Sequence, residues 1–137
     1  MSTDYGGDAA RAVDGNTDGD YNNNSVTHTA VDAKEAWWQV DLGASAAIGD
    51  IEVYNRTGGF GDRLTNYWVI VSENPITAQD LATARTGPGV TAKRQPDEAG
   101  TPTTVNFAGA PGRYVRIQLE NQSGPLSLAE VCVYKHP

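Results

Sequence analysis

The stretch GRYVRIQLE, residues 112–120, decides the expected fold because apolar and polar side chains alternate along it. Residues 115, 117 and 119 are branched aliphatics, and they alternate with Tyr114, Arg116, Gln118 and Glu120. An extended chain places successive side chains on opposite faces, so the pattern is typical of an antiparallel strand with one face in the core and the other in water. The stretch therefore predicts an all-β, antiparallel protein.

Further segments share this β-branched and aromatic character and are bounded by Gly, Pro, Asn or Asp. They are residues 37–43, 48–55, 66–73, 103–109 and 126–135. Six short strands separated by turn residues predict a single-domain β-sandwich. One short helix is expected over residues 77–84 with Thr77 as its cap, and the polar, Gly- and Pro-rich residues 86–102 are expected to form a surface loop.

Length and charge limit the classes of function. A chain of 137 residues is one domain's worth, so residues 1–137 are predicted to form one domain with its own core. Ten basic and 17 acidic residues give a net charge of −7, which disfavours nucleic acid and anionic lipid as partners unless one face is locally basic. No apolar run approaches the ~20 residues that span a bilayer, so no membrane insertion is expected.

Cys132 is the one cysteine, so no disulfide can form within the chain. Its apolar neighbours indicate a packed strand position. The fold must therefore be held by packing, with Trp37, Trp38 and Trp68 as the candidate centre of the core.

The densest polar segment is VDGNTDGDYNNNS, residues 13–25, in which every second residue from 14 to 20 is Asp or Asn. Calcium binds six to eight oxygens from carboxylates, amides and carbonyls, and a Gly-rich turn lets carbonyls converge, so the composition suits Ca²⁺. Its first half matches a helix-loop-helix calcium motif, but Ser25 stands where that motif needs a bidentate Glu, and the motif is rejected. The composition also fits a solvated loop of Asx turns.

Glu130 interrupts an otherwise apolar strand, between Ala129 and Val131. A buried carboxylate without a partner would cost on the order of several kcal/mol. A cation held jointly by Glu130 and the loop over residues 14–25 would supply a partner and tie the last strand to the first loop. The alternative is that Glu130 faces solvent on the outer side of the sheet.

His28 follows the acidic loop, and an isolated histidine commonly has a structural role. Arg56 and Arg63 bracket the loop RTGGFGDR, which leaves Phe60 at a glycine-flanked tip. Guanidinium groups offer five donors in a fixed plane that can bind neighbouring sugar hydroxyls, and imidazole can bind a third. An aromatic side chain can then cover the apolar patch of the sugar ring. Surface pairing with nearby acids is the alternative role for both arginines.

In their order along the chain these motifs resemble the F-type lectin domain, a fucose-binding relative of the discoidin and coagulation factor type C domains. The resemblance runs through VDGNTDGD, SVTHT, WWQVDLG, IEVYNRTGGFGDRL and LAEVCVY, which is nearly the whole chain. The family signature is a His, about 26 residues, and then Arg-x-Asp-x4-Arg/Lys; here 27 residues separate His28 from Arg56, and Arg63 follows at the expected distance.

The resemblance implies a jelly-roll sandwich, galactose-binding-like and discoidin-like, with long loops at one end. It also implies that His28, Arg56 and Arg63 contact the ring oxygen and the 3- and 4-hydroxyls of α-L-fucose. A structural Ca²⁺ site is part of the same resemblance. The residues that match the family's calcium positions, by side chain or by backbone carbonyl, are Arg11, Asp14, Asn16, Ser25, Ala129 and Glu130. In the family the ion orders the loop that presents the histidine and does not touch the sugar.

Two positions depart from the family pattern. Gly58 stands where the motif has Asp, and Gly59 and Phe60 stand where many members have adjacent cysteines. Phe60 is predicted to replace the apolar platform of that cysteine pair by stacking on the sugar. Tyr21 is a candidate for the wall against the sugar's C6 methyl group.

The leading hypothesis is a secreted, calcium-stabilised and non-catalytic module that binds terminal α-L-fucose on fucosylated glycans, appended to a larger enzyme or repeated in tandem. A discoidin-like membrane-surface or protein-adhesion module is the alternative, and the acidic, Gly-rich loops argue against it. A fucoside-cleaving enzyme is a third class. The chain has no GxSxG, HExxH or phosphate-loop motif, whereas composition alone does not exclude a pair of catalytic carboxylates.

Overall fold

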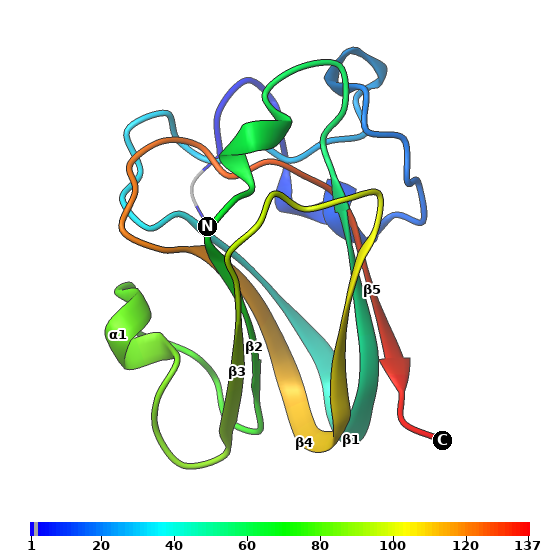
Figure 1. Ribbon diagram of the computed structural model, residues 1–137, viewed down its shortest axis with the longest axis vertical. Coiled ribbons are helices and arrows are strands. Elements are labelled where there is room, and N and C mark those ends of the chain that lie inside the picture. The colour runs from blue at the N-terminus through cyan, green and yellow to red at the C-terminus, as the bar shows by residue number, and fades with distance from the viewer. Residues whose placement is uncertain (2) are drawn as a thin grey trace.

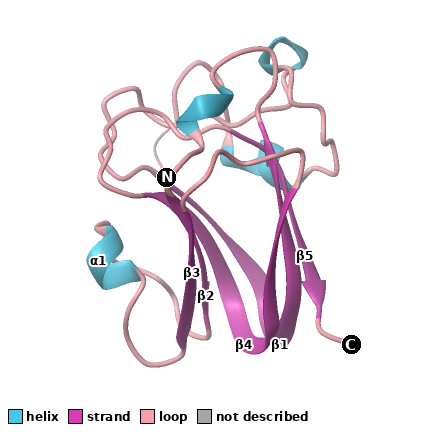
Figure 2. Ribbon diagram, viewed as in Figure 1, coloured by secondary structure: helices cyan, strands magenta, loops and turns pink. Residues whose placement is uncertain are grey.

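The protein is all-β, as the alternating stretch predicts (Figures 1 and 2). The computed structural model describes Met1 and residues 3–137. Its strands are β1 (Trp37–Asn55), β2 (Tyr67–Ser72), β3 (Val90–Gln95), β4 (Thr103–Leu119) and β5 (Leu128–Lys135). Its helices are the short 3-10 turns η1 (Ala9–Val13), η2 (Tyr21–Asn23) and η3 (Gly61–Arg63) and the single-turn α1 (Leu81–Ala84).

These strands form one antiparallel sheet in the order β3-β2-β4-β1-β5. The pairing of β1 with β4 shifts register between Asp41 and Ala46, and each long strand joins two of the predicted short strands. The first half of β1 pairs with the second half of β4, while the second half of β1 pairs with β5 and with the start of β4. Buried residues from both halves share one core, so the folded sheet supplies both layers of the predicted sandwich.

Only one of the three tryptophans lies in the main core. Trp38 is 1% exposed and packs with the aliphatic residues of β1, β2 and β4. Trp68 packs instead against a second, smaller cluster that includes Leu81 of α1, and Trp37 covers the guanidinium of Arg116 at 4.2 Å. The predicted tryptophan centre of the core is therefore correct for Trp38 alone.

The polar face of β4 is buried, contrary to the prediction that it faces water. Arg116 and Gln118 are fully buried because residues 76–79 lie over them. Arg116 Nη1 donates to the carbonyl of Ala78 at 2.6 Å, and its Nη2 donates to that of Ile76 at 2.9 Å. Removal from water lowers the pKa of Arg116 to about 10. Backbone carbonyls thus accept the hydrogen bonds that water would accept from this arginine in an exposed strand.

Two local predictions are wrong. Residues 90–95 form β3 and not a loop; β3 pairs with β2 only, and an edge strand tolerates a polar sequence with Lys and Arg. α1 begins after Asp80 and not at Thr77, since Asp80 Oδ2 accepts from the backbone N–H of Thr83 at 2.9 Å. In both cases polar residues determine the local structure, so the hydrophobic pattern of the sequence does not predict it.

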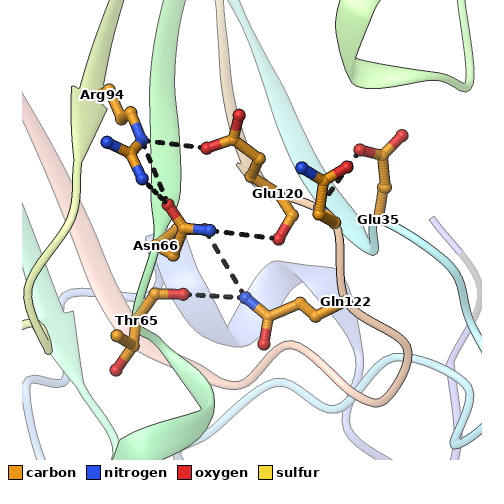
Figure 3. Close-up of polar contacts among 7 residues, drawn as sticks. Glu35, Thr65, Asn66, Arg94, Glu120 and Gln122 are labelled. Carbon is orange, nitrogen blue, oxygen red and sulfur yellow. Dashed lines mark hydrogen bonds and ion pairs between the residues drawn. The ribbon is translucent and has the colours of Figure 1, made fainter.

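Long loops gather at one end of the sheet, at the top of Figure 1, and the C-terminus lies at the other end. Figure 3 shows polar contacts that join several of these loops. Arg94 donates to Asn66 at 2.7 Å and to Glu120 at 2.9 Å, and Gln122 donates to the carbonyl of Thr65 at 2.7 Å. The loop end is therefore braced by a side chain from β3 and by side chains from the connections between strands. None of the helices in the described part of the chain is long and apolar enough to cross a membrane.

Candidate functional site

His28 is held in place through its backbone from both sides. Its N–H donates to the carbonyl of Gly7 at 2.9 Å, and its own carbonyl accepts from the N–H of Asp4 at 2.9 Å. The flanking Thr27 donates to Leu128 at 2.9 Å, so the segment also docks beside β5. A Cβ at position 7 would come within 2.3 Å of the His28 nitrogen, which is why glycine stands there. The histidine is 5% exposed and has little freedom to move.

The ring of His28 presents a lone pair to the loop end. Its Nδ1 lies 2.7 Å from the carbonyl of Thr29, which can only accept, so Nδ1 carries the proton of the neutral ring. Nε2 is then an acceptor, and Arg63 Nη1 lies 3.5 Å from it. Burial lowers the pKa of His28, and the positive charges of Arg63 and Arg56 lower it further against the opposing bond to Thr29. The imidazole is neutral at pH 7.

The lowered pKa of His28 predicts a pH-dependent stability. Because the unfolded chain takes up this proton first, the contribution of His28 is complete above the ordinary pKa of 6.5 and is lost as the pH falls from there through the lower folded pKa. Thermal melts followed from about pH 8 to about pH 5 should decline in that window, and His28→Gln should remove that part of the decline. His136→Gln, at the exposed C-terminus, is the control and should keep it.

A clamp at Asn55 shapes the loop that carries both arginines. Asn55 is 3% exposed, and its Nδ2 donates at 2.9 Å to the carbonyls of both Gly61 and Ala99. Its Oδ1 accepts from the N–H of Arg56 at 2.8 Å. One side chain therefore holds the start and the end of the loop together, and at the tip Phe60 adopts φ +65°, a conformation that costs a non-glycine residue energy.

Asn55→Ala is expected to lower the free energy of unfolding by about 1–3 kcal/mol, because the buried carbonyl of Ala99 and the N–H of Arg56 lose this partner, while the carbonyl of Gly61 retains only the N–H of Leu64. Urea denaturation measures this directly. Asn106→Ala is the matched control: its exposed side chain donates to Asp50 and accepts from the N–H of Ala108, both in contact with water, so it should change stability less than Asn55→Ala does. Equal effects of the two substitutions would contradict the clamp.

The loop brings the predicted sugar contacts together around Phe60. The Arg63 guanidinium carbon lies 4.1 Å from the centre of the Phe60 ring, and that of Arg56 lies 4.8 Å from it. Arg56 also lies 4.6 Å from the ring centre of Tyr21, whose own ring centre is 6.0 Å from that of His28. Five of the six predicted residues thus form one cluster, while Gly59 contributes the backbone beside it at φ +105°.

The acidic loop is a chain of Asx turns. The backbone N–H groups of residues 16, 18, 20 and 22 each donate to the side-chain oxygen two residues earlier, at 2.9–3.0 Å. Ser25 is fully buried, and its hydroxyl donates to the carbonyls of Asp18 at 2.5 Å and Asp20 at 3.1 Å. Asp14 and Asn16 are joined directly, since the N–H of Asn16 donates to Asp14 Oδ1.

Glu130 is buried, at 2% exposure, so the alternative that it faces solvent is wrong. Among the described residues its Oε2 has no hydrogen-bond partner. Burial raises its pKa, as does the negative charge of Asp14, against a backbone hydrogen bond from Gly15. Two carboxylates therefore approach one another at the start of the acidic loop, where a cation would neutralise both.

The remaining predicted calcium ligands lie in elements that meet at Glu130. Backbone pairing of Thr27 with Leu128 and of Thr29 with Leu126 sets Ser25 opposite Glu130 if the register continues by two residues. Arg11 lies in η1, which packs against β5, and its side chain donates to the carbonyl of Val26 at 3.1 Å. Ala129 precedes Glu130 and is fully buried. No group of three His, Cys, Asp or Glu side chains occurs as a metal-ligand set in the described residues, so a cation here would rely on amide, hydroxyl and carbonyl oxygens beside the two carboxylates.

The acidic loop and the arginine loop are also joined directly. The N–H of Thr57 donates to the carbonyl of Gly19 at 2.9 Å, and Asp20 pairs with Thr57 as an isolated β-bridge. A Cβ at position 19 would lie 2.8 Å from the Thr57 nitrogen, so this contact needs glycine. Neither this contact nor the Asn55 clamp is predicted from the sequence; the glycine before Asp20 is a signal that indicates the first.

Comparison with known proteins matches the chain to domains whose names describe sugar binding. A family model for NedA-like, galactose-binding domains, related to the coagulation factor 5/8 type C domain, matches residues 11–117. The structure of a Streptococcus pneumoniae fucose binding module is 37% identical, with a TM-score of 0.84, over 99% of this chain and 88% of that chain. The lectin domain of lectinolysin, solved with Lewis B antigen, is also 37% identical, with a TM-score of 0.85, over 100% of this chain and 90% of that chain.

Among curated proteins, Fucolectin-6 of Anguilla japonica is 36% identical over 66 residues, which are 48% of this chain and 35% of that protein. The match thus spans about a third of the length of this curated relative. The family model covers most of the chain, and the two bacterial modules align along nearly all of it. The chain belongs to the F-type lectin, or fucolectin, domain family, within the NedA-like, galactose-binding relatives of the coagulation factor type C domains.

Proposed function

We propose that this chain binds terminal α-L-fucose on fucosylated glycans as a calcium-stabilised, non-catalytic module. The observation that carries the proposal is the meeting of an acceptor, His28 Nε2, with the donors of Arg63 and Arg56 around the half-exposed ring of Phe60. A sugar presents the complementary set, because its hydroxyls both donate and accept and its ring carries an apolar patch. The pneumococcal relative is a fucose binding module, and the lectinolysin domain was solved with Lewis B antigen.

Each side chain has one task in this proposal. One hydroxyl donates to His28 Nε2 and accepts from Arg63, since those two nitrogens lie 3.5 Å apart and a single oxygen can reach both. Arg56 binds the neighbouring oxygen with its planar fork. Phe60 and Tyr21 flank the apolar face of the sugar ring, and Gly59, which has no side chain, allows the loop backbone to approach the sugar. The relatives are binding modules and lectins, and the chain is a binding module and not an enzyme.

Calcium fits the residues at Glu130 and the acidic loop. The unpartnered Oε2 of Glu130 and the adjacent Asp14 supply charge, and Asn16 and Ser25 supply neutral oxygens. The backbone carbonyls of Arg11, Asn16 and Ala129 would complete the set. When bound, the ion supplies positive charge that offsets two neighbouring carboxylates. The acidic loop that would hold the ion continues from Ser25 to His28, and it bonds the arginine loop where the carbonyl of Gly19 accepts from Thr57. An ion that orders the acidic loop would therefore also order both parts of the sugar site.

A single small surface site of this kind is expected to bind weakly, with a Kd of about 10⁻³ to 10⁻⁵ M. Avidity would then come from repetition in tandem or from attachment to a larger secreted enzyme. Such an arrangement places the module outside the cell, where fucosylated glycans are displayed. Both points are parts of the proposal.

Titration of the purified chain with methyl α-L-fucoside, methyl α-D-galactoside and phosphatidylserine vesicles, with calcium present, tests the proposed function. Binding to the fucoside alone, in the range of about 10⁻³ to 10⁻⁵ M, is the expected outcome. Binding to the vesicles in place of the fucoside would support the discoidin-like alternative and contradict the proposal. So would hydrolysis of an aryl fucoside that one carboxylate substitution abolishes.

A further inference from the structure

The arginines of the site make no ion pair with an acid in the part of the chain that the structure describes. Among the described residues the ion pairs are Arg94 with Glu120 and Arg113 with Asp41, both away from the site. Neither Arg56 nor Arg63 has a carboxylate oxygen within 4.0 Å in that part of the chain. Because His28 is neutral, the cluster presents two positive charges that form no ion pair within the described residues.

These two charges are held close to one another. Both guanidinium carbons lie within 4.8 Å of the same Phe60 ring, so their mutual repulsion is offset by ring faces and not by an acid. Burial lowers the pKa of Arg56, and the charge of Arg63 lowers it further. Asp20 acts on Arg56 only from a distance, because its carboxylate caps η2 by accepting from the N–H of Asn22.

One donor of this pair is also unused. The Nε of Arg56 is buried and has no hydrogen-bond partner in the described chain. Space lies beside the same loop: a Cβ at Gly58 or at Gly59 would meet no atom within 4 Å. Two cations that make no ion pair among the described residues, with open space beside their loop, describe a site that suits an anionic group as well as neutral hydroxyls.

We infer that the site prefers a fucosylated saccharide that carries an oxyanion, a sulfate ester or a carboxylate, on the fucose or on the adjoining sugar. The inference rests on the proposed function and names the class of glycan that it selects. A planar guanidinium fork matches the two oxygens of such a group, which a lone hydroxyl does not. The chain's charge of −7 acts over the whole surface, whereas this recognition is confined to one locally basic patch.

Isothermal titration with matched neutral and charged probes measures the preference. The probes are methyl α-L-fucoside and its monosulfate esters, and a neutral fucosylated trisaccharide with its sialylated form; the two pairs separate sulfate from carboxylate. At least one charged probe should bind about tenfold more tightly than its neutral partner in about 20 mM salt, and the ratio should fall below about threefold in about 0.5 M salt. Charged probes that bind no better than the neutral ones at low salt would overturn the inference.

A substitution at position 58 tests the electrostatic cause. Asp and Asn both tolerate the positive φ of Gly58, +73°, and differ there only in charge. Gly58→Asp should abolish the preference for the charged probe, and Gly58→Asn should keep it. Arg113→Gln, which removes one positive charge near the opposite end, should also keep it. Equal preferences in the Asp and Asn variants would contradict the inference.

The outcomes also separate this inference from the proposed function. A wild-type chain that binds neutral and charged fucosides equally well retains the proposed function and lacks the preference. A chain that binds none of the probes contradicts both.

Discussion

Arg63→Ala is expected to weaken binding of methyl α-L-fucoside by about a hundredfold or more while leaving the melting temperature within about 2 °C of wild type. The guanidinium donates toward the position that a sugar hydroxyl would share with His28, and it lies over the Phe60 ring at 4.1 Å. Charge-assisted hydrogen bonds contribute roughly 1.5–3 kcal/mol each, and removing two of them gives the stated loss. Stability should hold because Arg63 makes no ion pair in the described chain and its guanidinium lies as far as 3.5 Å from His28 Nε2, which makes that contact a weak one.

The measurement is isothermal titration paired with differential scanning calorimetry on the same samples. Arg113→Ala serves as the control, because its salt bridge with Asp41 is exposed and lies in the strand pair near the other end. It should leave affinity unchanged. Near-wild-type affinity in Arg63→Ala would remove Arg63 from the site, and a large fall in its melting temperature would assign it a structural role instead.

Glu130→Gln is expected to be less stable than wild type with calcium bound, and at least as stable as wild type without calcium. With calcium at about 100 times its Kd, the wild-type chain should gain about 2.7 kcal/mol, which for this size is about 6–10 °C in melting temperature. Glu130→Gln should lose most of that gain, because an amide oxygen replaces a charged ligand. In chelator the order should reverse and the Gln variant should melt at or above wild type, because the substitution removes a buried carboxylate next to Asp14.

Glu120→Gln is the matched control for this experiment. Glu120 pairs with Arg94 in the network of Figure 3, away from the acidic loop. Its substitution should therefore leave the calcium-induced rise in melting temperature unchanged. A Glu130→Gln variant that melts below wild type by the same amount with and without calcium would show that Glu130 stabilises the protein without an ion. Titration of the wild-type chain with methyl α-L-fucoside, with and without calcium, completes the test. Calcium removal should weaken fucoside binding, because the ion is proposed to order the loop that positions His28.

The fold class could be predicted because alternation in residues 112–120 and the turn residues between segments are local signals. Strand continuity could not: β1 passes through the Gly43 turn, at φ +88°, and continues in the same sheet, so a residue that usually ends a strand here only bends one. The buried face of β4 was missed for a related reason. Arg116 donates its hydrogen bonds to carbonyls about 40 residues away in the sequence, and a local sequence pattern does not predict so distant an acceptor.

Much of the candidate site was predictable because its chemistry is carried by residue types at fixed spacing. His28, Arg56 and Arg63 meet as the resemblance implies, and Phe60 lies between both arginines and the solvent. Asn55 was not predictable, since its amide reaches Ala99, 44 residues away, and an Asn at a strand end reads as an ordinary turn residue.

A crystal structure of the chain grown with calcium and methyl α-L-fucoside would locate the sugar. We expect one fucose ring against Phe60, with one hydroxyl bonded to both His28 Nε2 and Arg63 and a neighbouring oxygen bonded to Arg56. A fucose ring bound elsewhere on the chain, with these three side chains left in contact with solvent, would contradict this expectation.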